Sequence, residues 1–235
     1  MRNYFTLGGT DSRTFGVYIS GQGTFNAPTR ESDMLSIPGR NGDLIGLGAR
    51  LANAELTYPA FIYANFRENL ANFRAFLMSD TGYRRLVDAY NPGEYRLAAY
   101  SGGLEVEATS KNNAGAFDIV FNVKPQRFLL SGDETTTLTA SGTITNPTLF
   151  DAAPLLRVYG AGTLGINSDT IVISAADVYT DIDCETMYAY KGSTSKNQYV
   201  SVSGLDFPVL RPGANNIVLG SGITSIEITP RWWTV

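Results

Sequence analysis

The chain has 235 residues, enough for one large β domain or two ordinary domains. It contains no histidine and one cysteine, which excludes a Ser-His-Asp triad, a histidine-ligated zinc site, a proximal-histidine haem and an intrachain disulfide. Its 18 basic and 22 acidic residues give a net charge of −4, which does not favour binding to duplex DNA. Two possibilities remain: catalysis by carboxylate, Lys, Tyr or Ser side chains, or a protein without catalytic activity.

The sequence carries no evident signal for export or membrane insertion. The segment Met1–Gly9 becomes polar within a few residues and lacks the apolar core of a signal peptide. No run of about 18 apolar residues occurs, so we expect no membrane span. The unpaired Cys184 fits a reducing compartment. We therefore expect synthesis and assembly in a cytoplasm.

The first strong β signals surround a glycine-rich turn. Alternation predicts a strand over Arg13–Ile19, and two further strands, Asp33–Ile37 and Asp43–Ile45, flank the turn. Asn41-Gly42 favours a hairpin because both residues accept positive φ at little cost. We expect the segment Gly39–Gly48 to form an arm. The candidate hairpin residues are Pro38, Gly39, Arg40, Asn41, Gly42 and Asp43.

One strand and one helix follow. The strand Glu55–Tyr63 contains Pro59, which cannot donate a ladder hydrogen bond and therefore predicts an edge strand or a bulge. A helix is expected over Asn65–Met78, capped by Asn65 with Glu68 in a capping-box-like arrangement. Its apolar stripe, which would face a core, consists of Phe66, Leu70, Phe73 and Leu77.

Turn-separated strands continue through the rest of the chain. An antiparallel meander is expected before a polar stretch near Ser131, where we place a domain boundary, giving domains 1–131 and 132–235. The second domain shows short strands with turns every 8–12 residues, typical of a sandwich or jelly roll. The strands of the first domain are Tyr83–Ala89, Tyr95–Tyr100, Leu104–Thr109 and Ala116–Val123; those of the second are Leu155–Tyr159, Thr170–Ile173, Asp181–Asp183, Met187–Tyr190, Tyr199–Val202, Leu205–Leu210, Asn216–Leu219 and Ile223–Thr229.

Gly160-Ala161-Gly162-Thr163-Leu164-Gly165 matches the glycine pattern of dinucleotide-binding proteins. That pattern binds pyrophosphate only where a helix opens at the third glycine. Here Ile166–Ser174 contains turn formers followed by a β-branched alternation, which predicts a strand. The segment is therefore interpreted as a hairpin turn, and no cofactor is expected.

Three carboxylates recur at alternate positions in Asp181-Ile182-Asp183-Cys184-Glu185. Such a face could bind Ca²⁺, but calcium sites usually draw ligands from loops, so a solvated strand face is preferred. Cys184, on the opposite face, is expected to be a small buried residue. The basic segment Lys124–Phe128 is interpreted as a strand end leaving the first domain rather than as a nucleic-acid site. No catalytic or metal-ligating residue is proposed.

Taken together, the order of these motifs resembles the distal tail proteins of siphophages, the phages with long non-contractile tails. The resemblance rests on Ser36–Leu44, the helix Asn65–Met78, Tyr83-Arg84-Arg85-Leu86, Phe121–Phe128, Asn146-Pro147-Thr148, Pro154–Gly160, Asp181–Glu185, Leu210–Ile217 and Ile228–Trp233. It covers nearly the whole chain. One departure is Phe76-Leu77, where the family usually has Trp-Leu.

The resemblance implies a mainly β protein that acts as a scaffold, not as an enzyme. It implies an N-terminal ring-forming domain, sandwich- or barrel-like with one helix, and a C-terminal galectin-like (jelly-roll) β-sandwich. Six copies would form a ring at the distal tip of the virion tail and leave a channel for DNA. Its partners would be the tail tube protein, the tail-associated hub or lysin protein and, in many phages, receptor-binding proteins.

A second hypothesis is a carbohydrate-binding adhesion module that recognises glycans on the host surface. Its candidate stacking residues are Trp232 and Trp233, although alternation along a strand would send one ring into the core. A hydrolase using two carboxylates needs no histidine and also stays open, but no pair of carboxylates stands out in the sequence.

Overall fold

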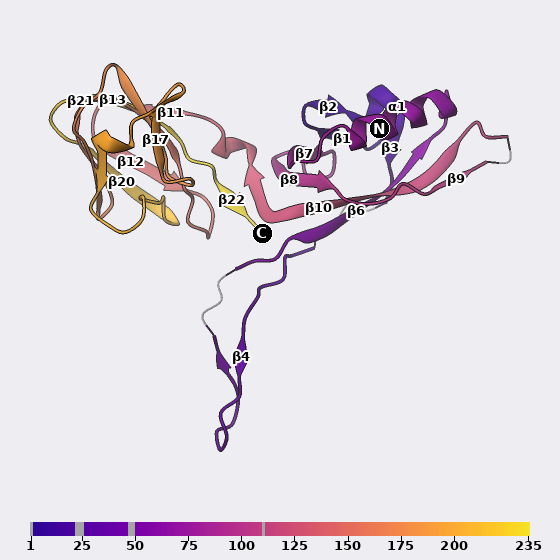
Figure 1. The fold of residues 1–235 in the computed structure, drawn as a ribbon, viewed down its shortest axis with the longest axis horizontal. Coiled ribbons are helices and arrows are strands. Elements are labelled where there is room, and N and C mark those ends of the chain that lie inside the picture. Colours follow the sequence, from indigo (N-terminus) through magenta and orange to yellow (C-terminus); the bar gives the residue numbers. More distant parts are fainter. Residues whose placement is uncertain (1, 22–25, 47–49, 110) are drawn as a thin grey trace. The chain divides into compact units, whose positions relative to one another are not determined.

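In a computed structural model, residues 2–21, 26–46, 50–109 and 111–235 are described. The chain divides into two compact units, residues 1–127 with Val235, and residues 128–234. The division thus falls between Arg127 and Phe128, a few residues before the polar stretch used to place it from the sequence. Both units are built mainly of antiparallel strands (Figure 1).

The main sheet of unit 1 closes on itself. Its strands follow the order β2-β1-β7-β8-β10-β6-β3, and β9 pairs with β10 beside this path. A bridge between Asn3, just before β1, and Ile19, at the end of β3, links the two ends, so the sheet is barrel-like. The strands are β1 (Phe5–Leu7), β2 (Thr10–Asp11), β3 (Val17–Ile19), β6 (Ala54–Ile62), β7 (Arg84–Asp88), β8 (Glu94–Tyr100), β9 (Val106–Ala108) and β10 (Gly115–Leu129).

The expected meander is only partly correct. β7 pairs with β8 as predicted, but β8 then neighbours β10 directly, and β9 pairs with the start of β10. The other side of β10 carries β6 along Gly115–Val123. The long β10 can hold two short strands on one side because it has 15 residues.

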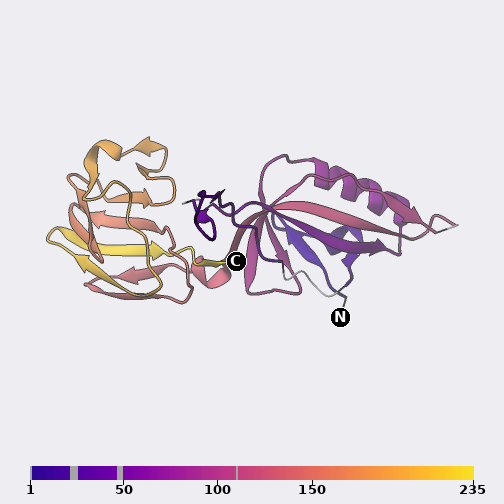
Figure 2. The ribbon, with the colours of Figure 1, turned by 90° about the horizontal axis from the view of Figure 1, so that it is seen from below.

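The helix α1 (Phe66–Met78) covers the core of unit 1, as its apolar stripe predicted (Figure 2). Phe66, Phe73 and Leu77 are buried, and Leu70 packs against them. The Phe73 ring lies 5.8–6.5 Å from several aromatic rings, in contacts that stabilise beyond area burial. These neighbouring rings are those of Phe5, Phe15, Phe76 and Phe117.

The predicted capping box at the start of α1 is wrong. Asn65 adopts a left-handed conformation (φ 46°), and its side chain makes no capping hydrogen bond. Instead the Asn69 side chain donates to the Ala64 carbonyl at 2.9 Å. At the other end, the Arg84 guanidinium donates to the carbonyls of Phe76 and Leu77 at 3.2 and 3.0 Å. Arg84, from β7, thus satisfies carbonyls that lack partners within the helix.

Two strand predictions in unit 1 need correction. Arg13–Ile19 is not one strand, because Ser12–Phe15 forms a 3-10 turn and only Val17–Ile19 is extended. β6 is not an edge strand, since it lies between β10 and β3. Pro59 is tolerated there because the pairing with β3 stops at Ala60, and beyond it the Ser20 amide donates to the Pro59 carbonyl at 2.7 Å.

Unit 2 is a two-sheet sandwich. One sheet has the order β11-β21-β13-β16-β17-β18 and the other β12-β20-β14-β15-β19, and both contribute buried residues to one core. The strands are β11 (Thr136–Leu138), β12 (Gly142–Asn146), β13 (Leu155–Gly160), β14 (Gly162–Ile166), β15 (Asp169–Ile173), β16 (Tyr179–Asp183), β17 (Tyr188–Lys191), β18 (Thr194–Ser195), β19 (Val200–Val202), β20 (Gly213–Leu219) and β21 (Ile223–Thr229). A last short strand is β22 (Trp233–Thr234), and just before it the Trp232 carbonyl accepts a hydrogen bond from the Leu129 amide at 2.8 Å within unit 2.

The glycine motif in unit 2 forms the link between β13 and β14, as the hairpin interpretation predicted. Gly160 has φ 96°, and a Cβ there would lie 2.1 Å from the Gly222 carbonyl oxygen. This glycine therefore permits two backbones to approach, not a phosphate to bind. The predicted strand Leu205–Leu210 is wrong, because the segment forms a loop with one bridge, between Leu210 and Ala152.

No helix among the described residues has the length and apolar character needed to cross a bilayer.

Candidate functional site

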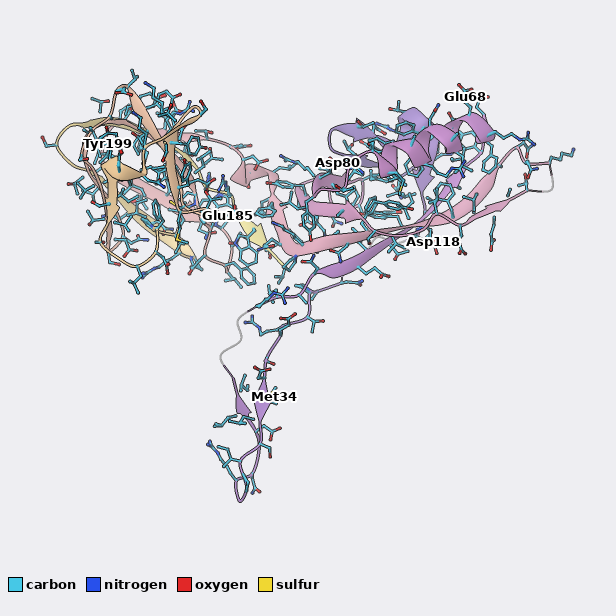
Figure 3. All side chains as sticks on the ribbon, viewed as in Figure 1. Met34, Glu68, Asp80, Asp118, Glu185 and Tyr199 are labelled. Atoms are coloured by element: carbon cyan, nitrogen blue, oxygen red, sulfur yellow. The ribbon has the colours of Figure 1, made fainter. Side chains whose placement is uncertain are left out.

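The main candidate site is a β-hairpin in unit 1, formed by β4 (Met34–Leu35) and β5 (Leu44–Ile45). Met34 pairs with Ile45 and Leu35 with Leu44, as the sequence predicted for strands around the glycine-rich turn. We call residues 29–46 and 50–52 the arm; in Figures 1 and 3 it extends away from the sheet of unit 1. Residues 47–49, which include the predicted end of the arm at Gly48, lie outside the described residues.

Hydrogen bonds continue the ladder toward the base of the arm. The Gly46 amide donates to the Asp33 carbonyl at 2.6 Å, the Glu31 amide to the Arg50 carbonyl at 2.9 Å, and the Ala52 amide to the Thr29 carbonyl at 2.8 Å. Side chains add an ion pair, because Arg50 lies 2.6 Å from the Glu31 carboxylate. The arm is therefore a two-stranded ribbon over most of its length. Such ribbons are marginally stable in water unless something packs against them.

The turn at the tip of the arm differs from the expected one. Gly39 and Gly42 adopt positive φ values of 82° and 79°, whereas Asn41 does not. The eight residues Ser36–Asp43 separate the two strands, so the turn is longer than the two-residue type that Asn41-Gly42 favours. The Arg40 amide donates to the Ile37 carbonyl at 3.1 Å, and the Arg40 side chain is exposed.

Both faces of the arm are apolar and exposed. Met34, Leu35 and Ile45 keep 61–69% of their surface in solvent and Leu44 keeps 38%. Because directly paired residues share a face, Met34 and Ile45 lie on one face and Leu35 and Leu44 on the other. A ribbon that shows apolar side chains on both faces is typical of an interaction segment.

The sequence reasoning identified the turn of this site but not these four side chains. Their signal is present in the sequence as two apolar pairs at consecutive positions. Consecutive residues of a strand point to opposite faces, so such a pair cannot be buried by one sheet packing on one side.

The carboxylates of Asp181–Glu185, the acidic strand of unit 2, form ion pairs with arginines. Asp181 is buried and accepts two hydrogen bonds from Arg157 at 2.7 and 3.1 Å, so the prediction of a solvated face is wrong at this residue. Asp183 accepts two from Arg231 at 2.8 and 3.0 Å, and Glu185 lies 3.4 Å from the same guanidinium. Burial alone would raise the pKa of Asp183, but the bonds from Arg231 hold this pKa below its usual range.

These pairings leave little capacity for a cation at the acidic strand. Within the part of the chain that the structure describes, no three His, Cys, Asp or Glu side chains are set to hold a metal ion. Cys184 is buried, as predicted, and burial raises the pKa of its thiol to about 12.

The two tryptophans proposed for sugar stacking lie in different surroundings. Trp232 is 5% exposed and belongs to the core of unit 2, so it cannot offer a face to a sugar. Trp233 stacks on Phe150 with ring centroids 4.4 Å apart, and its Nε1 donates to the Asp151 carbonyl at 2.8 Å. Only Trp233, part of whose surface stays open, remains available to the carbohydrate hypothesis.

The basic segment Lys124–Phe128 lies at the end of β10, as the strand interpretation predicted. Arg127 is nearly buried and lies 2.6 Å from Glu94 on β8. A cation that is paired with a carboxylate inside unit 1 contributes to packing there and offers little to a nucleic acid.

Comparison with solved structures finds the same fold in phage proteins. SPP1 Dit (gp 19.1), described as a paradigm of the hub adsorption apparatus in Gram-positive infecting phages, matches with a TM-score of 0.70 and 14% identity over 100% of both chains. The phage P2 baseplate in its activated conformation matches in a Ca form and a Sr form, with TM-scores of 0.52 and 0.51 and 12% identity. Each covers 97% of this chain, and 98% and 97% of the baseplate chains.

No protein-family profile and no curated protein matches the sequence. At 12–14% identity the likeness establishes the fold, and it does so from one end of the chain to the other. The mainly β architecture with one helix, expected from the resemblance to distal tail proteins, is confirmed.

Proposed function

We propose that this protein is a structural component of a phage tail tip, the distal tail hub of a non-contractile tail, and not an enzyme. The observation that carries the proposal is the shared fold with SPP1 Dit, a hub adsorption protein, over the full length of both chains. A match limited to one unit would suggest a shared module. A match through both units supports a shared role for the whole chain.

We further propose that six copies form a closed ring. A cyclic ring needs a heterologous interface, in which one surface of each copy meets a different surface of the next. The arm supports this proposal because it is a projecting ribbon with apolar side chains on both faces. Burying these faces against a neighbour would stabilise both the ribbon and the ring.

In this role unit 1 forms the ring and the galectin-like unit 2 is the second domain of each copy. The ring would join the tail tube protein to the tail-associated hub or lysin protein, with receptor-binding proteins as further partners. DNA would pass through the bore without sequence-specific contacts. Residues 1–127 carry 13 basic and 12 acidic side chains, so a ring formed by unit 1 would be nearly neutral and would attract a passing duplex only weakly.

The mass of the purified protein tests the ring. Six copies of the 25.4-kDa chain have a mass of about 152 kDa, which light scattering after size exclusion separates clearly from monomer. Negative-stain electron micrographs of the same fraction should show rings with a central hole. A protein that stays monomeric at every concentration, or that forms filaments rather than closed rings, would contradict the proposal.

A further inference from the structure

A groove on the outer face of the unit 1 sheet is a concave surface that no step above has used. It has a volume of about 720 Å³ and is lined by β6, β10 and the segment that leads into β9. Its apolar floor includes Pro59, Phe61 and Val120, which alternate with residues that face the core. The groove therefore lies on the opposite side of the sheet from the core.

The groove also carries acidic side chains. Glu105, Glu107 and Asp118 line it, and its lining residues include no Lys or Arg. In the β9–β10 register Glu107 lies opposite Ala116 and Val106 opposite Phe117, and Glu105, just before β9, lines the same groove as Asp118. Figure 3 shows Asp118 on the side of β10 away from α1. Like charges placed opposite each other on neighbouring strands are unfavourable.

No ion pair to these three carboxylates occurs among residues 2–21, 26–46, 50–109 and 111–235. A cation seated in the groove would relieve their mutual repulsion. Because the floor is apolar, the same occupant should also bring apolar side chains. A projecting segment that fits the groove would therefore carry one basic residue among apolar or small ones.

The tip of the arm has this chemistry. The turn Ser36–Asp43 contains one basic residue, Arg40, and one acidic residue, Asp43, together with Ile37, Pro38 and two glycines. Arg40 is exposed and makes no ion pair with any residue that the structure describes. Below the tip, Met34, Leu35, Leu44 and Ile45 are also uncovered in the single chain, so the groove of the same copy does not hold the arm.

We propose that the groove is the receiving surface for the arm of a neighbouring copy, with Arg40 between Glu105, Glu107 and Asp118. This inference rests on the proposed ring and assigns its two contact surfaces. The contact is heterologous, because the arm and the groove are different surfaces of the same unit, as a cyclic assembly requires. Ion pairs in the groove would fix the register of the arm, while its apolar side chains would provide most of the affinity.

Two charge reversals test the contact, Arg40→Glu in the arm and Asp118→Arg in the groove. Arg40→Glu places a carboxylate among three carboxylates, and Asp118→Arg places a second cation beside Arg40, so each alone should weaken association by about tenfold or more. Mixing the two purified variants should restore the ring. In an alternating ring of six, the glutamate at position 40 meets the arginine at position 118 at every second contact, and the native pair meets at the others.

The matched control is Arg67→Glu, which reverses an exposed charge on α1 and should leave the ring unchanged. Circular dichroism melts of all three variants check that unit 1 stays folded. Wild-type rings with unaffected single variants would overturn the assignment of the groove while leaving the proposed function standing. Defective single variants that do not complement each other would also overturn it, and would point to another occupant. A monomeric wild type would instead contradict the proposed ring itself.

Discussion

Replacing the four apolar side chains of the arm should abolish assembly without destabilising the chain. The variant carries Met34→Ser, Leu35→Ser, Leu44→Ser and Ile45→Ser. These side chains keep 38–69% of their surface in solvent, so the folded single chain draws little stability from burying them. Any stabilisation they provide must come from the surface that covers them in an assembly.

The magnitude follows from the surface left to bury. Fully burying a side chain of this size is worth about 1.5–3 kcal/mol, and about half of each remains to be buried, or about 1 kcal/mol each. Four such side chains give about 4 kcal/mol per contact. Since about 1.4 kcal/mol corresponds to a factor of ten, the association constant of each contact should fall by about a thousandfold.

Sedimentation velocity over a range of protein concentrations measures this change, and circular dichroism melts measure the stability of the chain. The matched control is Leu149→Ser with Leu205→Ser, which removes two apolar side chains from unit 2 that are 88% and fully exposed. The control should assemble like wild type. The reasoning is refuted if the arm variant still forms rings at wild-type concentrations, or if its melting temperature falls together with its mass.

Three further predictions concern packing and reactivity. Phe73→Ala should lower the free energy of unfolding of unit 1 by about 3–5 kcal/mol, because the ring is fully buried. Denaturant unfolding measures this change. The control is Arg74→Ala at an exposed position, which should change the free energy of unfolding by less than about 0.5 kcal/mol. Gly160→Ala should cost about 3 kcal/mol, because its Cβ would lie 2.1 Å from a backbone oxygen. Gly39 also has a positive φ but lies in open space, so Gly39→Ala should lower the free energy of unfolding by only about 1 kcal/mol in the same denaturant experiment. The Cys184 thiol, buried and with its pKa raised to about 12, should resist a thiol reagent at pH 8 until the protein unfolds; rapid labelling of the native protein would contradict its burial.

The local features of this protein could be predicted because local physics decides them. The stripe of α1 appears in the sequence because side chains three and four residues apart share a helix face. The arm appears because glycines and a proline interrupt two short apolar runs. The glycine motif of unit 2 could be assigned to a turn because no helix-forming sequence follows it.

Features that depend on distant partners could not be predicted. Asp181 is buried because Arg157, 24 residues away, donates two hydrogen bonds to it, and Asp183 is held by Arg231, 48 residues away. Arg84, on the next strand, donates hydrogen bonds to the last carbonyls of α1. The helix therefore needs no basic residue in its own last turn. The sequence offers several candidates for each such partner, and only the packed chain selects one.

The sequence by itself determined a two-part, mainly β chain with one helix, a projecting hairpin and no histidine-dependent or disulfide chemistry, because composition, periodicity and turn residues are properties of short segments. Only the tertiary structure decided which apolar residues stay uncovered. Met34, Leu35, Leu44 and Ile45 look like core residues in the sequence, and they become an interaction surface because the ribbon that carries them has no sheet beside it. Likewise the three carboxylates of the groove come together only when β9 and β10 pair. Burial and charge clustering depend on contacts between segments far apart in the chain, and these contacts are set by the fold as a whole.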